Sequence, residues 1–321
     1  MKKNIFADIK KDFPDIQKNI SLKEYTTFRV GGKAKYFFVA KNKNILPLFL
    51  ATVKKYKLPI LIFGGGSNIL VSDKGFNGLA IKIENKEMEF SGDKVLVGAG
   101  VALSRFANIA SKNGFSGFEW AVGIPSATVG GSIYGNAQAF GNKISDFVES
   151  VDVFDLKTLK IKKINKQQCK FSLKNSIFKK NKNLIIISII FNLQKGDNIQ
   201  IKKNINNFLK HRKNCHPMNF ASAGSVFVNP EVKIKNKKLL EKFPELSEFN
   251  KMSTIPSAYL IEKAGLKGKK IGKAQISEKH ANFIVNLGGA KTKDILSLIK
   301  LAQKQVKNIF KINLKIEVQI I

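Results

Sequence analysis

The chain has 321 residues, of which 44% are hydrophobic, so it is long enough for two domains with sizeable cores and indicates a folded globular protein. No stretch reaches the ~18 uninterrupted apolar residues of a membrane span, and the opening segment lacks the apolar region and cleavage site of a signal peptide. We therefore expect a cytoplasmic protein with no membrane partner.

The formal net charge of +33 would first suggest nucleic acid, because clustered Lys and Arg form an electrostatic footprint. However, Arg29, Arg105 and Arg212 are the only arginines among 56 basic residues, and the lysines are spread among abundant Asn, Ile and Phe. This pattern is typical of a coding bias toward A/T-rich codons, whereas a base-reading surface uses the planar fork of arginine. We expect no specific nucleic-acid partner, although a basic protein suits anionic small molecules.

The two cysteines, Cys169 and Cys215, have neither CxxC nor Cys/His spacing. That spacing favours free thiols over a metal site or a disulfide framework.

The predicted elements alternate between strands and helices along most of the chain, which indicates a mixed α and β fold. In chain order we predict a strand at 36–40, a helix at 44–57, strands at 59–63, 79–83 and 94–100, a helix at 102–114, and strands within 148–164 and at 183–194. A polar turn and a basic helix follow at 195–214. The rest of the chain predicts helices at 258–265 and 292–310 and strands at 281–287 and 312–321. No internal repeat or low-complexity linker interrupts this pattern.

Two glycine-rich segments are candidates for phosphate binding. Gly64, Gly65 and Gly66 come directly after an apolar strand, and a second cluster occupies 123–141. Glycines allow close backbone approach and successive N–H groups can surround an anion, so the pair suits a long ligand with a pyrophosphate held from both sides. Neither segment is a Walker loop, and "GAGVAL" at 98–103 has Leu103 in place of the third glycine of a dinucleotide fingerprint. Tight turns without a ligand remain the alternative.

Ser225 in "SAGSVFVNP" raises a chemical question. An activated serine needs a base and an orienting group, and His211, His216 and His280 give no obvious partner. Ser225 is therefore either a turn residue or a group with different chemistry.

Six motifs together resemble the UDP-N-acetylenolpyruvoylglucosamine reductase (MurB) family, from about Thr26 onward. In order they are "TTFRVGGKA", "GGGSN", "GIPSATVGG" with "GNAQAFG", "AGSVFVNP", "LIEKAGLKGKKIGKAQISEKHANFIVN" and "LKIEVQII". The short middle region resembles the subgroup that lacks an extra tyrosine loop closing over the substrate.

The resemblance implies an α+β protein with an FAD-binding domain of the vanillyl-alcohol-oxidase (PCMH) type and a C-terminal α/β substrate-binding domain. We place the first domain at 1–195, with a core of about 26–194, and the second at 196–321, with the C-terminal strand contributing to the active site. The implied reaction is reduction of an enolpyruvyl UDP-sugar to UDP-N-acetylmuramate in peptidoglycan precursor synthesis. Its cofactors are bound FAD and NADPH, and we expect a monomer.

The same resemblance implies the site residues. Ser225 would donate a proton to the α-carbon after hydride reaches the β-carbon from flavin N5, and Glu317 would face the substrate carboxylate as a neutral hydrogen-bond donor. The implied FAD-binding residues are Arg29, Gly64, Gly65, Gly66, Ser67, Asn68, Gly123, Ile124, Pro125, Thr128, Gly130, Gly131, Asn136 and His280. The implied substrate-binding residues are Asn229 and Gln275, and no metal is implied.

The sequence departs from the family pattern at a catalytic position. Leu173 and Lys174 stand where the family usually has Tyr and Arg, so Lys174 keeps the charge but loses the bidentate fork. Lys273 and Lys315 also replace usual family residues, and "GIPSATVGG" contains one extra residue. Two alternatives therefore stay open, another flavoprotein oxidoreductase on this fold and a basic binding protein that has lost catalysis.

Overall fold

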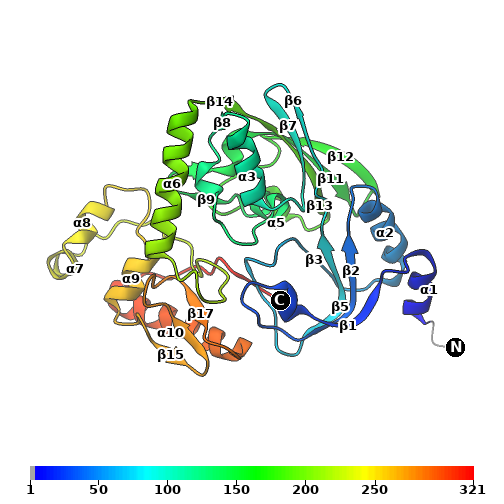
Figure 1. The fold of residues 1–321 in the computed structure, drawn as a ribbon. Coiled ribbons are helices and arrows are strands. Elements are labelled where there is room, and N and C mark those ends of the chain that lie inside the picture. The colour runs from blue at the N-terminus through cyan, green and yellow to red at the C-terminus, as the bar shows by residue number, and fades with distance from the viewer. Residues whose placement is uncertain (1–3) are drawn as a thin grey trace. The chain divides into compact units, whose positions relative to one another are not determined.

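A computed structural model describes residues 4–321 of the chain, which form two compact units (Figure 1). The first unit comprises residues 4–21, 33–66 and 75–212, and the second comprises 22–32, 67–74 and 213–321. The second unit is therefore built from three separate stretches of sequence.

The first sheet of the first unit is four-stranded, in the order β1-β2-β5-β3. Its strands are β1 (Gln17–Ser21), β2 (Lys33–Ala40), β3 (Ile60–Phe63) and β5 (Phe76–Ile83), and the helices α1 (Ile5–Asp12) and α2 (Ile45–Val53) accompany it. The strands β2, β5 and β3 are parallel, whereas β1 is antiparallel to β2. Phe49 of α2 stacks on Phe38 of β2 with ring centroids 3.9 Å apart, so the apolar face of α2 covers this sheet.

The second sheet of the same unit is antiparallel and five-stranded, in the order β12-β11-β13-β7-β6. Its strands are β6 (Met88–Ser91), β7 (Lys94–Gly98), β11 (Val148–Asp155), β12 (Lys160–Asn165) and β13 (Leu184–Asn192). The central strand β13 is a run of β-branched residues buried on both faces, as expected for a strand covered on each side. Phe106 of α3 (Leu103–Lys112) stacks on Phe191 of β13 at 5.1 Å.

Shorter elements complete the first unit. They are β8 (Phe115–Ser116), α4 (Val129–Tyr134), β9 (Gln138–Ala139), β10 (Asn142–Lys143), α5 (Ile177–Lys180), β14 (Gln194–Lys195) and α6 (Asn198–Cys215). The long helix α6 packs Phe208 against Phe140, with ring centroids 4.8 Å apart.

The second unit packs helices around a small sheet and a pair of parallel strands. Its elements are β4 (Ile69–Leu70), α7 (Lys237–Lys242), α8 (Glu245–Phe249), α9 (Ser257–Lys263), β15 (Lys270–Ile271), β16 (Ala274–Ile276), β17 (Ile284–Asn286), α10 (Thr292–Phe310) and β18 (Gln319–Ile320). The amphipathic face of α10 lies in one apolar cluster with Phe28, Val30 and Leu70. These three residues come from the N-terminal stretches, which are thereby part of this core.

The longer predicted elements agree with the structure, and one prediction needs correction. The basic helix predicted within 195–214 is present as α6, which groups with the first unit up to Arg212. The strand predicted at 312–321 is present only in part: Ile316 pairs with Phe227 in an isolated bridge and β18 pairs with β4, and backbone hydrogen bonds to these neighbours begin at Lys315. Its alternation is real but reflects burial of Ile312, Leu314 and Val318 in the core.

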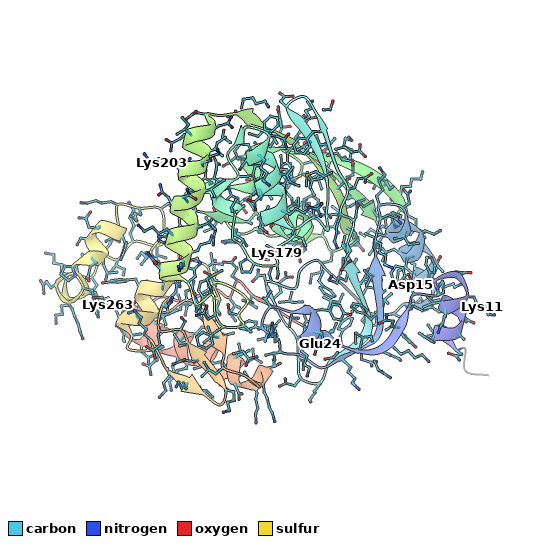
Figure 2. The ribbon with its side chains drawn as sticks, viewed as in Figure 1. Lys11, Asp15, Glu24, Lys179, Lys203 and Lys263 are labelled. Atoms are coloured by element: carbon cyan, nitrogen blue, oxygen red, sulfur yellow. The ribbon has the colours of Figure 1, made fainter. Side chains whose placement is uncertain are left out.

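Lysines project from helices in both units, including Lys11 of α1, Lys203 of α6 and Lys263 of α9 (Figure 2). Their spread agrees with the expectation of a dispersed charge.

Candidate functional site

The two glycine loops of the first unit lie directly against each other. A Cβ atom added at Gly65 would collide with the carbonyl oxygen of Ser126, and one added at Gly64 would collide with Oγ1 of Thr128. Only glycine permits this approach, because any side chain would fill the same space. The two predicted loops are therefore in direct contact, Gly65 with backbone of the second loop and Gly64 with the Thr128 side chain.

The second loop leads into the short helix α4. Oγ1 of Thr128 accepts from the N–H of Gly131 at 3.3 Å, and the N–H of Gly130 donates to Ala99 at 2.9 Å. Ser126, in the part of the loop that holds one residue more than the family pattern, has a left-handed φ of +56°. The loop turns at this residue, and the Ser126 carbonyl faces Gly65.

Asn136 connects this loop to the segment that carries Lys174. It is 3% exposed, its Nδ2 donates to the carbonyl of Ser172 at 2.9 Å, and Oγ of Ser176 donates to Tyr134 at 2.7 Å. Ser172 and Asn175 exchange backbone hydrogen bonds of 3.1 and 3.2 Å. The segment is therefore a two-residue hairpin turn tied to the end of α4.

Leu173 and Lys174 form the tip of that turn, and Lys174 has a φ of +52°. A left-handed φ at a non-glycine residue is uncommon and persists where the surroundings fix it. Lys179 supports the tip, since its Nζ donates to the Lys174 carbonyl at 3.1 Å.

Within the second unit, the structure brings the Ser225 strand and the Glu317 segment together. The N–H of Glu317 donates to the carbonyl of Val226 at 2.8 Å, and Phe227 pairs with Ile316 in an antiparallel bridge. On its other side Ser225 pairs with Phe283. Ser225 and Glu317 are both partly exposed, so ligands can reach their side chains.

Asn282 fixes this arrangement from inside the unit. Its Oδ1 accepts from the N–H of Phe227 at 2.9 Å and its Nδ2 donates to the Phe227 carbonyl at 2.8 Å. A buried side-chain amide satisfied on both atoms holds the strand beside it in one register. Asn68 adds a further link, because Nδ2 donates to the Glu317 carbonyl at 3.5 Å.

The remaining predicted residues of the second unit have structural partners of their own. Oδ1 of Asn229 accepts from the N–H of Ser257 at 2.9 Å and so caps α9, while Nε2 of Gln275 donates to Gly268 at 3.0 Å. The ring of His280 lies 5.5 Å from that of His216 and 4.8 Å from Phe283, which sequence spacing did not indicate. Arg29 is exposed on a turn and has a φ of +52°.

Sequence reasoning assigned no role to Arg212, although it sits at the second glycine loop. It is 7% exposed, and Nη2 donates to the Trp120 carbonyl at 2.8 Å. Burial disfavours the charged form of a side chain, so it lowers the pKa of Arg212 from its ordinary value. For the same reason, burial raises the pKa of the Cys169 thiol to about 12. The sequence contained one signal that could have pointed to Arg212: it is one of three arginines in a lysine-rich chain.

Two other classes of site have no counterpart in residues 4–321. No group of three or more His, Cys, Asp or Glu residues is placed to hold a metal ion. None of the helices described is long and apolar enough to cross a membrane.

Family models match most of the chain. Residues 34–163 match the FAD binding domain, and residues 216–321 match the C-terminal domain of UDP-N-acetylenolpyruvoylglucosamine reductase. The UDP-N-acetylenolpyruvoylglucosamine reductase of Clostridium novyi is 36% identical over 97% of this chain and 93% of its own. That of Caldicellulosiruptor bescii is 38% identical over 99% of this chain and 92% of its own.

A solved structure agrees with these matches. The MurB crystal structure from Thermus caldophilus superposes with a TM-score of 0.75 at 27% identity, covering 95% of this chain and 99% of that one. The predicted fold class, an FAD-binding domain followed by a MurB C-terminal domain, is confirmed.

The residues present fit FAD, the cofactor of this family. Gly64 and Gly65 bring no side chains to the contact between the two loops, and the backbone N–H groups of such glycine-rich loops can bind a pyrophosphate. Asn136 also carries a buried Oδ1 without a hydrogen-bond partner in the part of the chain described, so an acceptor is available to a ligand N–H. The chain belongs to the UDP-N-acetylenolpyruvoylglucosamine reductase family and is an FAD-dependent oxidoreductase.

Proposed function

We propose that this protein reduces the enolpyruvyl ether of UDP-N-acetylglucosamine to UDP-N-acetylmuramate, with NADPH as the reductant. Family membership over nearly the whole chain supports the reaction class. The observation that carries the proposal is the pairing of the Ser225 strand with the Glu317 segment, through the 2.8 Å hydrogen bond from Glu317 N–H to Val226. It supplies a hydroxyl and a carboxyl from neighbouring backbone segments.

Ser225 serves as the proton donor. Bound FAD would supply the two-electron chemistry that links NADPH to the enolpyruvyl β-carbon. Negative charge then develops on the α-carbon and its carboxylate, and a proton must reach that carbon. A neutral hydroxyl is a weak acid in water, yet protonating an enolate-like carbon is strongly downhill. The Ser225 hydroxyl therefore has to be placed close to the α-carbon, and it does not need a histidine to activate it.

Glu317 and Lys174 stabilise the developing charge in this scheme. Glu317 is proposed to lie beside the substrate carboxylate and to donate a hydrogen bond to it. Lys174 supplies a positive charge from a rigid turn in place of the usual arginine. Asn229 and Gln275 are proposed to contact the sugar nucleotide, and Arg29, Ser67, Asn68, Ile124, Pro125 and His280 the flavin.

The remaining assignments follow from this reaction. The proposed division of labour is cofactor binding by the region up to residue 195 and substrate binding by the region after it. We propose a cytoplasmic monomer that uses NADPH and a UDP-sugar. Both ligands are anionic, and the net charge of +33 attracts such ligands to the protein.

The replacement at Lys174 favours one rival, a basic binding protein that has lost catalysis. A purified protein without the yellow flavin spectrum, retaining nucleic acid, would support that rival.

The reaction is tested in two anaerobic steps. NADPH is expected to bleach the bound flavin, and the enolpyruvyl sugar nucleotide is then expected to restore its colour with formation of UDP-N-acetylmuramate. UDP-N-acetylglucosamine, which lacks the double bond, serves as the control and leaves the flavin reduced. A flavin that stays reduced after the true substrate is added would rule out the proposed reaction.

A further inference from the structure

Arg212 is a buried cation whose hydrogen bonds are incomplete. Nη2 donates to the Trp120 carbonyl at 2.8 Å, and the guanidinium carbon lies 5.4 Å from the ring centroid of Phe140. Nε is buried and has no hydrogen-bond partner among residues 4–321. A planar guanidinium under an aromatic ring keeps its N–H groups directed outward in the plane, where an acceptor can meet them.

Among residues 4–321, the hydrogen-bond partner of Arg212 is the Trp120 carbonyl and no carboxylate forms an ion pair with it; burial lowers its pKa. The acidic residue beside Trp120, Glu119, has its Oε2 bound to the N–H of Gly117 at 2.6 Å. A buried charge without a counter-ion is costly, and a buried donor without an acceptor adds to the cost. An anion at this position would remove both penalties.

Arg212 lies beside Gly123, at the start of the second glycine loop of the same unit. A Cβ atom at Gly123 would lie 3.6 Å from Cδ of Arg212 and 2.7 Å from Leu209, so Gly123 packs on α6 at this point. The loop continues from Gly123 to Ser126, whose carbonyl faces Gly65. Three residues span at most ~11 Å, and with the contacts at either end of this path the stem of Arg212 lies within about 20 Å of the loop contact at Gly65.

We propose that Arg212 is an anion-binding residue of the cofactor site and that its ligand is the diphosphate group of the flavin nucleotide. The fork of the guanidinium binds phosphate oxygens through charge-assisted hydrogen bonds, and Phe140 covers its face. A lysine at this place would bring the charge without the directed pair of donors. This role explains an arginine at a buried position in a chain that otherwise uses lysine almost everywhere.

The inference rests on the flavin-dependent function proposed above, and its test measures binding alone. The full-length chain is freed of flavin and titrated with FAD and with riboflavin, which has no phosphate. Arg212→Met is expected to weaken FAD binding on the order of 10- to 100-fold, the worth of a hydrogen bond to a charged group, and to leave riboflavin affinity within about twofold. Arg212→Lys is expected to lose part of the FAD affinity and none of the riboflavin affinity.

Arg105→Met provides the matched control, because Arg105 is exposed on α3 and its replacement should change neither affinity. Thermal melting of each flavin-free variant separates binding from folding, and Arg212→Lys decides the question if Arg212→Met does not fold. Equal losses for FAD and riboflavin, or no loss for FAD, would overturn the proposal and leave Arg212 as a support for Trp120. Because neither NADPH nor the sugar nucleotide is present, failure of the proposed reaction would not change the result.

Discussion

Ser225 follows Gly224, which has a φ of +73° and no atom within 4 Å of the place where its Cβ would be. The left-handed conformation turns the chain immediately before the serine, and the bridges on both sides of the strand fix the backbone from Ser225 to Phe227. The hydroxyl is therefore carried by rigid backbone while it remains partly exposed. Such a placement suits a group that transfers one proton at a defined point.

Replacing this hydroxyl should separate the two half-reactions. In Ser225→Ala, NADPH should still bleach the flavin at the normal rate, while re-oxidation by the enolpyruvyl sugar nucleotide should slow by ~10²-fold or more, because the proton donor is missing. Stopped-flow absorbance measures both steps.

The matched variant is Ser225→Cys, which still has a proton to give and should keep measurable turnover. If Ser225→Ala reduces the substrate at the normal rate, Ser225 is not the proton donor and serves only as a turn residue.

Lys174 is tested by varying charge and geometry separately. Lys174→Arg should retain or increase turnover, because it keeps the charge and restores the fork. Lys174→Met should lower turnover by ~10²-fold if the charge stabilises the developing carboxylate charge. Steady-state kinetics of both variants provide the measurement, and the exposed Lys180 nearby supplies the control Lys180→Met. Equal turnover in the wild type and Lys174→Met would remove this residue from the mechanism.

Motifs in the sequence predict candidate site residues. They do not predict which other residues contact those candidates in the folded chain. Ser225, Glu317 and the glycines were found through motifs, because their chemistry requires those residue types. The bond from Asn229 to Ser257, the ring contact between His216 and His280 and the burial of Arg212 depend on tertiary packing. Residue spacing along the chain contains no signal for them.

At the scale of elements, the two glycine loops can contact each other because their glycines have no side chains. The contact between Gly65 and the Ser126 carbonyl has no room for a methyl group, whereas a Cβ at Gly135 would lie 3.8 Å from its nearest neighbour. Both glycines belong to the predicted cofactor region, so they form a matched pair for one experiment.

Gly65→Ala should force the two loops apart, and we expect a loss of bound flavin of ~10-fold or more together with a lower melting temperature. Gly135→Ala should bind flavin normally, because ordinary van der Waals space receives the added methyl group. Flavin content after gel filtration and thermal melting are the measurements. Retention of flavin by Gly65→Ala would show that the close approach of the loops is not needed for the cofactor.

Elements with a strong period of apolar residues could be predicted from the sequence. Strands that are defined by pairing with a distant segment could not. The helix at 292–310 agrees with α10, since its apolar residues recur at helical spacing. The segment 312–321 has strand-like alternation, yet a ladder also needs a neighbouring strand along its whole length, and here the neighbour changes from the segment 226–228 to β4 and its flanking residues. Two-residue strands such as β4 are too short for any periodic signal.

At the scale of the whole molecule, the two compact units do not follow the linear order of the chain. Segments 22–32 and 67–74 belong to the second unit, because Phe28, Val30 and Leu70 lie in its core. A linear reading of the sequence assigns each segment to its neighbours along the chain. It therefore places these residues with the first unit.

This discontinuous construction of the second unit bears on how the protein is made. Asn68 and Glu317, which are hydrogen-bonded in the finished unit, are 249 positions apart in the chain. At a synthesis rate of ~5–20 residues per second, the ribosome needs ~12–50 s to supply the second residue after the first. During that interval Phe28, Val30 and Leu70 have no completed core to enter. The early stretches of the second unit are consequently the part of the nascent chain that most needs chaperone protection.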